Sequence, residues 1–194
     1  MIWATSCGRC SGPTGAKNGQ VSLSKVEVWC EKDALAGVLE PVTDEYEVTL
    51  YPCRGYNSYS ALLEAADRIG EAEQGTVVLY LGDFDPSGQD MPRDVQERLE
   101  ADFGVEVDLR VIALTREQID TYNLPPAPAK RQDTRAAAFI AKHGDLSVEL
   151  DALPPNVLQA LVRDSIEALM DASAFRAEAD TERTEREQLR ALLP

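Results

Sequence analysis

The chain is poor in histidine, in cysteine and in positive charge. Its 194 residues include one histidine, His143, and four cysteines. A single histidine excludes metal sites built mainly from histidine and disfavours nucleophiles that need a histidine base. The cysteines are too few and too irregularly spaced for a disulfide framework, and Cys7 with Cys10 supplies at most half of a zinc site. We therefore expect any catalytic chemistry to use carboxylates.

Long apolar segments are also absent. No stretch approaches the ~20 residues that a membrane-spanning helix requires. Residues 1–24 lack the continuous apolar run of a secretory signal peptide. The length is sufficient for one full-sized domain with its own core. We expect a cytoplasmic protein with no membrane partner.

Acidic residues outnumber basic ones by 34 to 19, and the formal net charge is −15 at pH 7. Lysine and arginine drive phosphate binding, so this overall balance fits a nucleic-acid partner poorly. The acidic excess is uneven, however, and one segment is locally basic: Lys130, Arg131, Arg135 and Lys142. This segment is either a solvated helix face or a patch that contacts phosphate.

Strand and helix patterns alternate from residue 25 onward. Apolar or alternating runs predict strands at 25–30, 45–53, 76–82 and 105–114. Helical patterns lie between and after them. Alternation of this kind predicts an α/β fold, a Rossmann-like, mostly parallel sheet of about four strands with helices on both faces.

Prolines and polar residues suggest where the helices begin and end. We expect Pro41 to end the first helix and Asn57 to cap the second. Pro92 fits the third helix only in its first turn, after a turn that contains Gly88. Thr115 should cap the fourth. The second helix should bury one face: Tyr59, Leu62, Leu63, Ala66 and Ile69.

The pattern divides the chain into four segments. Residues 1–24 form a loose arm, and residues 25–122 form the α/β core. Residues 123–172 form a helical extension, with helices near 133–142 and 155–171. Residues 173–194 form a charged C-terminal helix. The buried-looking Cys30 and Cys53 are interpreted as small core residues.

Carboxylates directly follow two of the predicted strands. Glu31 follows the first, while Asp83 and Asp85 follow the third, and Gly88 completes a D-x-D-x-x-G pattern. Ligands of a parallel sheet bind outside the carboxyl ends of its strands, so the three carboxylates converge if these strands are neighbours. Their mutual repulsion is relieved by a proton or a hard cation such as Mg²⁺, with Mn²⁺ as an alternative.

A purely structural interpretation of these residues exists. Asp-Pro-Ser-Gly is a good turn sequence, in which Asp85 acts as a cap and Asp83 is the polar end of a strand. The joint occurrence of the pair and Glu31, each at a strand end, favours a metal site.

VEVWCEKDAL (26–35) followed by LGDFDPSG (81–88) resembles the Toprim domain, the metal-binding module of topoisomerases, bacterial primases and some nucleases. The DPSG form is most similar to the A subunit of topoisomerase VI and its meiotic double-strand-break relatives. Gly55 matches the family's glycine turn after the second strand, and VELDALPP (148–155) is similar to its closing segment. The resemblance covers about residues 25–172.

The resemblance implies roles for several residues. Asp83 and Asp85 would coordinate Mg²⁺, and Glu31 would act as general acid or base, as a metal ligand, or as both. Gly55 and Gly88 would be turn glycines. Lys32 is either a phosphate contact or a helix-surface lysine. The candidate phosphate or DNA contacts are Lys32, Arg54, Lys130, Arg131 and Arg135.

The chain departs from the family at the nucleophile. The family's attacking tyrosine lies on a winged-helix domain before the Toprim domain, and only residues 1–24 precede the first predicted strand here. We expect either a nuclease that activates water or one half of a system in which a partner protein supplies the tyrosine. DNA and a second copy of the chain are further expected partners.

Three functional hypotheses follow. The first is a Mg²⁺-dependent Toprim protein that acts on DNA phosphodiester bonds by nuclease-like hydrolysis or topoisomerase-like strand breakage. The second is a non-catalytic DNA- or protein-binding Toprim module. The third is a phosphatase that uses the D-x-D aspartate as nucleophile; it ranks lowest because it leaves Glu31 without a role.

Overall fold

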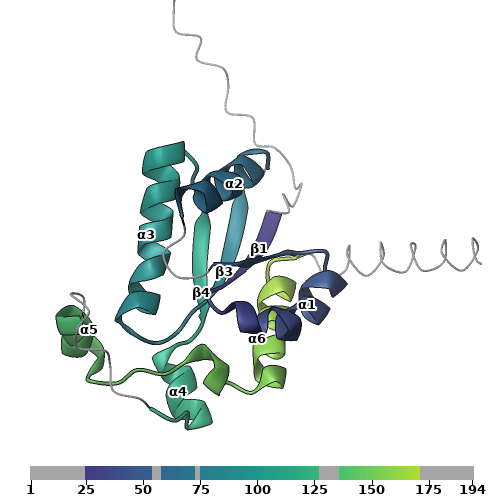
Figure 1. The fold of residues 1–194 in the computed structure, drawn as a ribbon. Helices are drawn as coiled ribbons and strands as arrows, with labels where there is room; N and C mark the ends of the chain where they lie inside the picture. Colours follow the sequence, from purple (N-terminus) through teal and green to yellow (C-terminus); the bar gives the residue numbers. More distant parts are fainter. Residues whose placement is uncertain (1–24, 54–57, 73–74, 127–135, 171–194) are drawn as a thin grey trace, which may run out of the picture.

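The computed structural model describes residues 25–53, 58–72, 75–126 and 136–170. Four parallel strands form one sheet: β1 (Lys25–Cys30), β2 (Thr49–Pro52), β3 (Thr76–Leu81) and β4 (Asp108–Ala113). Their order is β2-β1-β3-β4, so β1 and β3 are the central pair (Figure 1). The predicted α/β fold with about four parallel strands is confirmed.

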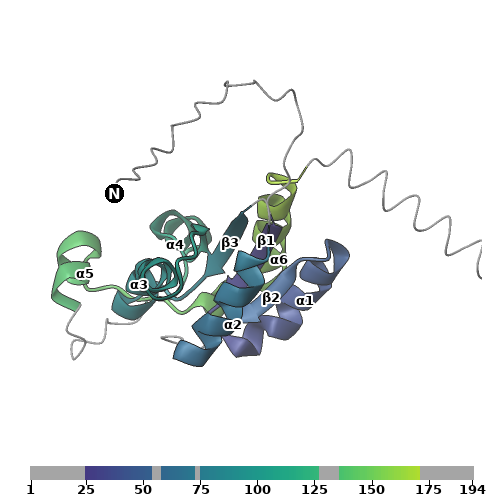
Figure 2. The same cartoon turned by 90° about the horizontal axis from the view of Figure 1, so that it is seen from above.

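Helices cover both faces of the sheet, as the alternation of patterns predicts (Figures 1 and 2). On one face α1 (Ala36–Glu45) packs against α6 (Pro155–Glu167). On the other, α2 (Tyr59–Gly70) packs against α3 (Pro86–Phe103). The shorter helices α4 (Arg116–Tyr122) and α5 (Ala136–His143) lie outside these layers. Two single 3₁₀ turns, η1 (Asp33–Leu35) and η2 (Leu150–Ala152), complete the described elements.

Strand β3 is buried at every position, which explains its unbroken apolar sequence TVVLYL. Val78 and Tyr80 belong to the core on the α2–α3 side, while Leu79 and Leu81 belong to the core on the α1–α6 side. Cys30 and Cys53 are buried free thiols, so their assignment as core residues is confirmed.

Two prolines lie inside helices, contrary to the sequence-based expectation. Helix α1 continues through Pro41 to Glu45, and α3 begins at Pro86, which places Pro92 in its interior. A proline removes one hydrogen bond from a helix, but burial of the neighbouring apolar residues offsets this loss. Leu39 and Val42 flank Pro41 in the core, and Pro92 is itself buried beside Met91.

The early start of α3 changes the role of Gly88. The sequence suggested a turn glycine, but Gly88 lies in the first turn of the helix and is buried. The turn between β3 and α3 therefore comprises only residues 82–85. This shorter connection brings the helix N-terminus close to the end of β3.

Helix α2 begins one residue later than expected and buries a narrower face. Ser58 is the N-cap, and its hydroxyl accepts a hydrogen bond from the N–H of Ala61 at 3.2 Å. Tyr59 and Leu63 were wrongly placed on the buried face, since they are 59% and 41% exposed. The residues that do face the sheet are Leu62, Ala65, Ala66 and Ile69. At α4, Thr115 is the N-cap as predicted, and it forms a capping box with Gln118.

Strands β2 and β4 are shorter than the alternating patterns that predicted them. Helix α1 extends to Glu45, and Glu47 has a positive φ of 52°. Strand β2 therefore begins only at Thr49. Helix α6 ends at Glu167 rather than near residue 171. No helix in the described ranges is long and apolar enough to span a membrane.

Several expectations fall outside the described residues. They concern the N-terminal arm 1–24 with Cys7 and Cys10, the cap Asn57, the glycine Gly55, and the charged helix 173–194. The basic candidates Arg54, Lys130, Arg131 and Arg135 lie outside them as well.

Candidate metal and phosphate site

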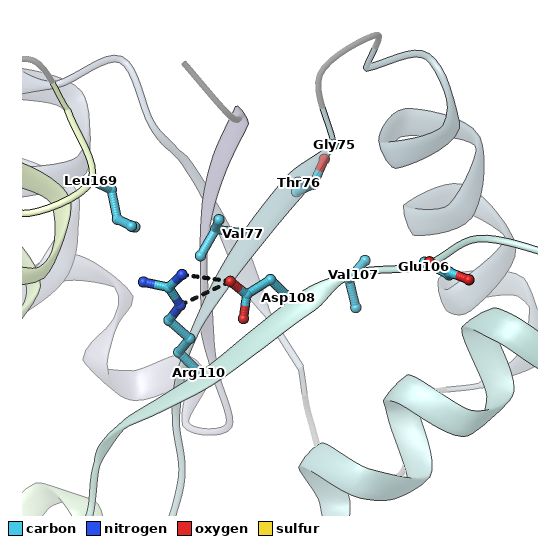
Figure 3. A pocket seen from close by; sticks show the side chains of 8 residues that line it. All are labelled: Gly75, Thr76, Val77, Glu106, Val107, Asp108, Arg110 and Leu169. Carbon is cyan, nitrogen blue, oxygen red and sulfur yellow. Dashed lines mark hydrogen bonds and ion pairs between the residues drawn. The ribbon is translucent and has the colours of Figure 1, made fainter. Parts of the chain in front are cut away.

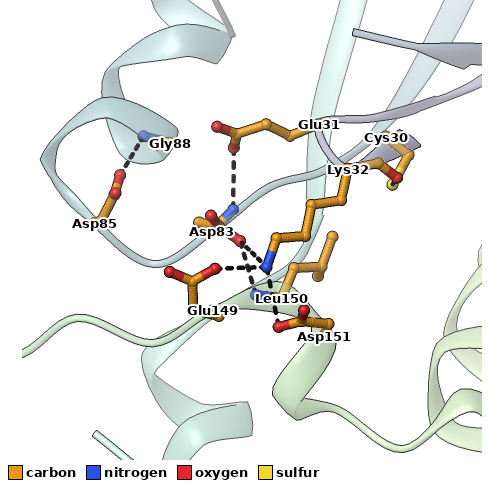
Figure 4. Close-up of polar contacts among 9 residues, drawn as sticks. All are labelled: Cys30, Glu31, Lys32, Asp83, Asp85, Gly88, Glu149, Leu150 and Asp151. Carbon is orange, nitrogen blue, oxygen red and sulfur yellow. Dashed lines mark hydrogen bonds and ion pairs between the residues drawn. The ribbon is translucent and has the colours of Figure 1, made fainter. Parts of the chain in front are cut away.

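The carboxyl ends of β1 and β3 bring Glu31 and Asp83 together. Cys30 and Leu81 are paired in the ladder, so Glu31 and Gly82 leave the sheet at the same level. The backbone N–H of Asp83 donates a hydrogen bond to Glu31 Oε2 at 3.1 Å (Figure 4). Residues far apart in the sequence therefore meet at the edge where a parallel sheet binds its ligands.

Two glycines permit this close approach. A Cβ atom on Gly88 would lie 2.3 Å from the backbone oxygen of Asp83 and 3.1 Å from Glu31 Oε2. A Cβ atom on Gly82 would lie 2.6 Å from the Tyr80 ring and 3.0 Å from Glu31 Oε2. Both positions exclude a larger residue unless the loop shifts. The D-x-D-x-x-G glycine thus allows α3 to pack onto the Asp83 backbone.

Asp85 has the structural role that the turn interpretation gave it. It is the N-cap of α3, and its Oδ1 accepts a hydrogen bond from the N–H of Gly88 at 2.7 Å. A carboxylate at a helix N-terminus is also stabilised by the helix dipole. Capping occupies one carboxylate oxygen and fixes the direction of the side chain.

Asp83 is held by a segment that sequence reasoning did not assign to the site. Residues 148–151 (Val-Glu-Leu-Asp), here called the acidic segment, run beside the loop after β3. Phe84 and Val148 form an antiparallel bridge with backbone hydrogen bonds of 2.9 and 3.0 Å. The N–H of Leu150 donates to Asp83 Oδ1 at 2.7 Å (Figure 4). Burial raises the pKa of Asp83, while this hydrogen bond lowers it in part.

Lys32 connects the first strand end to the acidic segment. Its Nζ lies 2.5 Å from Glu149 Oε2, 2.9 Å from Asp151 Oδ1 and 3.9 Å from Asp83 Oδ1. Partial burial lowers the pKa of Lys32, but hydrogen bonds to Glu149 and Asp151 outweigh it, and the net shift is upward. Lys32, for which the sequence left a phosphate contact and a helix-surface position open, therefore forms ion pairs within the protein.

Glu149 and Asp151 are the site residues that the sequence analysis missed. Both belong to VELDALPP, which was noted for its resemblance to the family's closing segment but given no role. The signal was the alternation of two carboxylates with the buried residues Val148 and Leu150. Asp151 lies in the 3₁₀ turn η2, and both carboxylates reach Lys32 Nζ.

Glu31 is the carboxylate with the strongest electrostatic perturbation. Burial, together with the charges of Asp83 and Asp85, raises its pKa to about 7, although the Asp83 N–H opposes the shift. No described lysine or arginine forms an ion pair with Glu31. Among the described residues Lys32 opposes this shift, and with a pKa of about 7 Glu31 exchanges its proton near neutral pH.

The hydroxyl of Tyr80 is a buried polar group next to Glu31. It has no hydrogen-bond partner in the described part of the chain. A Cβ atom on Gly82 would lie 3.1 Å from this hydroxyl and 3.0 Å from Glu31 Oε2, so the two oxygens flank the same point. Buried polar groups are nearly always paired, and an unpaired one marks a position for water or a ligand.

The donor set suits a hard divalent cation, which prefers carboxylate oxygens and water. The described residues nevertheless contain no group of three or more His, Cys, Asp or Glu side chains already placed to hold a metal ion. One oxygen of each aspartate is already hydrogen-bonded, since Asp83 Oδ1 accepts from the N–H of Leu150 and Asp85 Oδ1 from the N–H of Gly88. Metal binding would use the remaining oxygens.

A separate cavity of about 520 Å³ lies at the opposite, amino end of β3 and β4 (Figure 3). Thr76, Val77, Asp108, Arg110 and Leu169 are among the residues that line it. Asp108 and Arg110 form an ion pair there, and Glu106 also lines the cavity. The cavity therefore does not include the clustered carboxylates.

A scan of the chain against models of known protein families found no match, and a search of curated proteins found no relative. The Toprim resemblance thus rests on the motif residues alone.

Proposed function

We propose that this chain is a Mg²⁺-dependent Toprim protein that acts on DNA phosphodiester bonds, by hydrolysis or as the metal-binding half of a strand-breaking system. One observation carries the proposal: Glu31 and Asp83 come from adjacent strand ends and are joined by a 3.1 Å hydrogen bond, with Asp85 at the start of α3. This places three carboxylates at the ligand-binding edge of a parallel sheet.

In this proposal the aspartates bind the metal and Glu31 transfers a proton. Asp83 and Asp85 would hold the cation, which when bound neutralises negative charge that develops on a phosphate. Glu31 has a pKa of about 7, so it accepts or donates a proton near neutral pH. It is therefore the group best suited to act as general base or acid beside the scissile bond.

Tyr80 is poorly suited to supply the nucleophile. Tyr80 is the tyrosine next to Glu31, but it is fully buried, and burial raises the pKa of its hydroxyl well above the usual value. A neutral, buried phenol is a poor nucleophile. The attacking group is then water, or a tyrosine that a partner protein supplies.

A second candidate function is a non-catalytic Toprim module that binds DNA or protein. It is favoured by the lack of a ready-made ligand cluster among the described residues and by the ammonium of Lys32 within the site. Its signature would be nucleic-acid binding that persists in a chelator without turnover at any metal concentration.

The test is a Mg²⁺ and Mn²⁺ titration against single- and double-stranded DNA. Asp83→Asn, Asp85→Asn and Glu31→Gln should each abolish metal-dependent cleavage and leave the circular dichroism spectrum unchanged. Glu40→Gln, on the exposed side of α1, is the matched control and should retain full activity. Cleavage that survives in all three site variants would refute the proposal.

A further inference from the structure

We propose that the ammonium group of Lys32 takes the place of a second divalent cation, so that this site works with one metal ion and one built-in positive charge. This inference rests on the proposed function. It assigns to Lys32 a role inside the site rather than at a phosphate contact.

The position of Lys32 Nζ carries the argument. It lies between Asp151 at 2.9 Å and Asp83 at 3.9 Å, and it also binds Glu149 (Figure 4). In two-metal sites the cations stand about 3.5–4 Å apart and act together on one reacting phosphate. The Asp83 carboxylate lies 3.9 Å from Lys32 Nζ, so a second ion that used this carboxylate on that side would meet the ammonium.

The described ion pairs differ between the two sides of the site. Lys32 pairs with the carboxylates of Asp83, Glu149 and Asp151 and offsets one of their three negative charges. Glu31 and Asp85 on the other side form no ion pair with any described lysine or arginine. One divalent cation on that side would compensate them.

Lys32 is fixed in a way that distinguishes it from a surface lysine. Its carbonyl accepts hydrogen bonds from the N–H of Leu35 at 3.0 Å and from Cys30 Sγ at 3.4 Å, so its backbone is anchored at the end of β1. Its side chain is 23% exposed. The acidic segment that receives it is anchored by the bridge from Val148 to Phe84. Both partners of the ion pairs are therefore held before any metal binds.

The number of bound metal ions tests the inference directly. Isothermal titration calorimetry and electron paramagnetic resonance with Mn²⁺ on the full chain should give one ion per wild-type chain. Lys32→Met removes the ammonium and leaves Asp83, Glu149 and Asp151 uncompensated, so the variant should bind two ions whose spectra show magnetic coupling. Lys32→Arg keeps the charge and should bind one.

Lys32→Gln covers the case in which Lys32→Met fails to fold. Its amide still donates to the acidic segment while the charge is gone, so it should also bind two ions. Two ions in the wild type overturn the inference alone. One ion in both charge-removing variants also overturns it, because Lys32 would then serve only to anchor the acidic segment. A wild-type chain that binds no Mn²⁺ overturns the proposed function as well.

Discussion

The backbone N–H of Asp83 donates to the carboxylate of Glu31 across 52 positions of the chain, at 3.1 Å. This contact exists because β1 and β3 are neighbours in the sheet, with Cys30 paired to Leu81. The N–H stabilises the charged form of Glu31 and so lowers its pKa. Burial and the nearby aspartates raise that pKa by more. The resulting pKa of about 7 governs how this site responds to pH.

Glu31→Gln should alter the pH dependence of stability. Burial raises the pKa of Glu31 from 4.5 to about 7, so the folded protein binds this proton more tightly than the unfolded chain does. The stabilisation present below pH 4.5 is lost as the pH rises through 7. At pH 8 the variant should exceed the wild type by on the order of 2 kcal/mol, after allowance for solvent screening of this half-buried group.

Urea unfolding in a chelator between pH 4 and 8 measures this difference, and Glu40→Gln is the control. Parallel stability curves for wild type and Glu31→Gln across this range would show that the Glu31 carboxyl is not perturbed. In the presence of metal, the affinity of the wild type for Mg²⁺ should rise over the same range as Glu31 loses its proton.

Gly88→Ala should disrupt the loop that carries Asp83. The added methyl group would lie 2.3 Å from the Asp83 backbone oxygen, so the loop must move, and we expect a loss of about 2 kcal/mol in stability. Gly37→Ala in α1 is the matched control, since its Cβ would meet no atom within 4 Å. That change should stabilise the protein by up to about 1 kcal/mol. Thermal unfolding of both variants checks the contrast, and equal effects would contradict it.

The sequence predicted the architecture well because the signals were local. Strand β1 was predicted with its observed bounds, and the wholly apolar β3 was recognised as a central strand. The helix boundaries were less accurate at Pro41 and Pro92, because tertiary packing there outweighs the intrinsic cost of proline in a helix. A single sequence does not display that packing.

The candidate site was predicted only in part, for a geometric reason. Glu31, Asp83 and Asp85 were found because each follows a strand directly. Glu149 and Asp151 were missed because their approach depends on a long-range antiparallel bridge between Phe84 and Val148. The same bridge also brings the acidic segment to Lys32, whose ion pairs depend on this long-range contact.

Asp85→Asn and Asp85→Ala should separate the metal role of Asp85 from its capping role. Asparagine caps a helix as well as aspartate does, so Asp85→Asn should change stability by only a few tenths of a kcal/mol. Asp85→Ala loses the hydrogen bond to the Gly88 N–H and should cost about 1 kcal/mol. Both changes should weaken Mn²⁺ binding, measured by calorimetry. Wild-type affinity in Asp85→Asn would limit Asp85 to capping.

Arg68→Met tests the ion pair of Glu27, the one charged side chain among the described residues that is completely buried. Glu27 is 0% exposed on β1 and pairs with Arg68 at 2.8 Å, and the Trp29 indole donates to it at 3.0 Å. Removal of Arg68 leaves a buried carboxylate without its main partner, so we expect a loss of roughly 3–5 kcal/mol.

The double variant Glu27→Gln/Arg68→Met should recover part of that loss, since no buried charge remains unpaired. Arg93→Met is the control, because Arg93 is 56% exposed and its ion pairs on α3 are screened by solvent. Urea unfolding at pH 7 should place Arg93→Met within about 0.5 kcal/mol of wild type. Equal losses for Arg68→Met and Arg93→Met would show that the Glu27–Arg68 pair contributes no more than a surface ion pair.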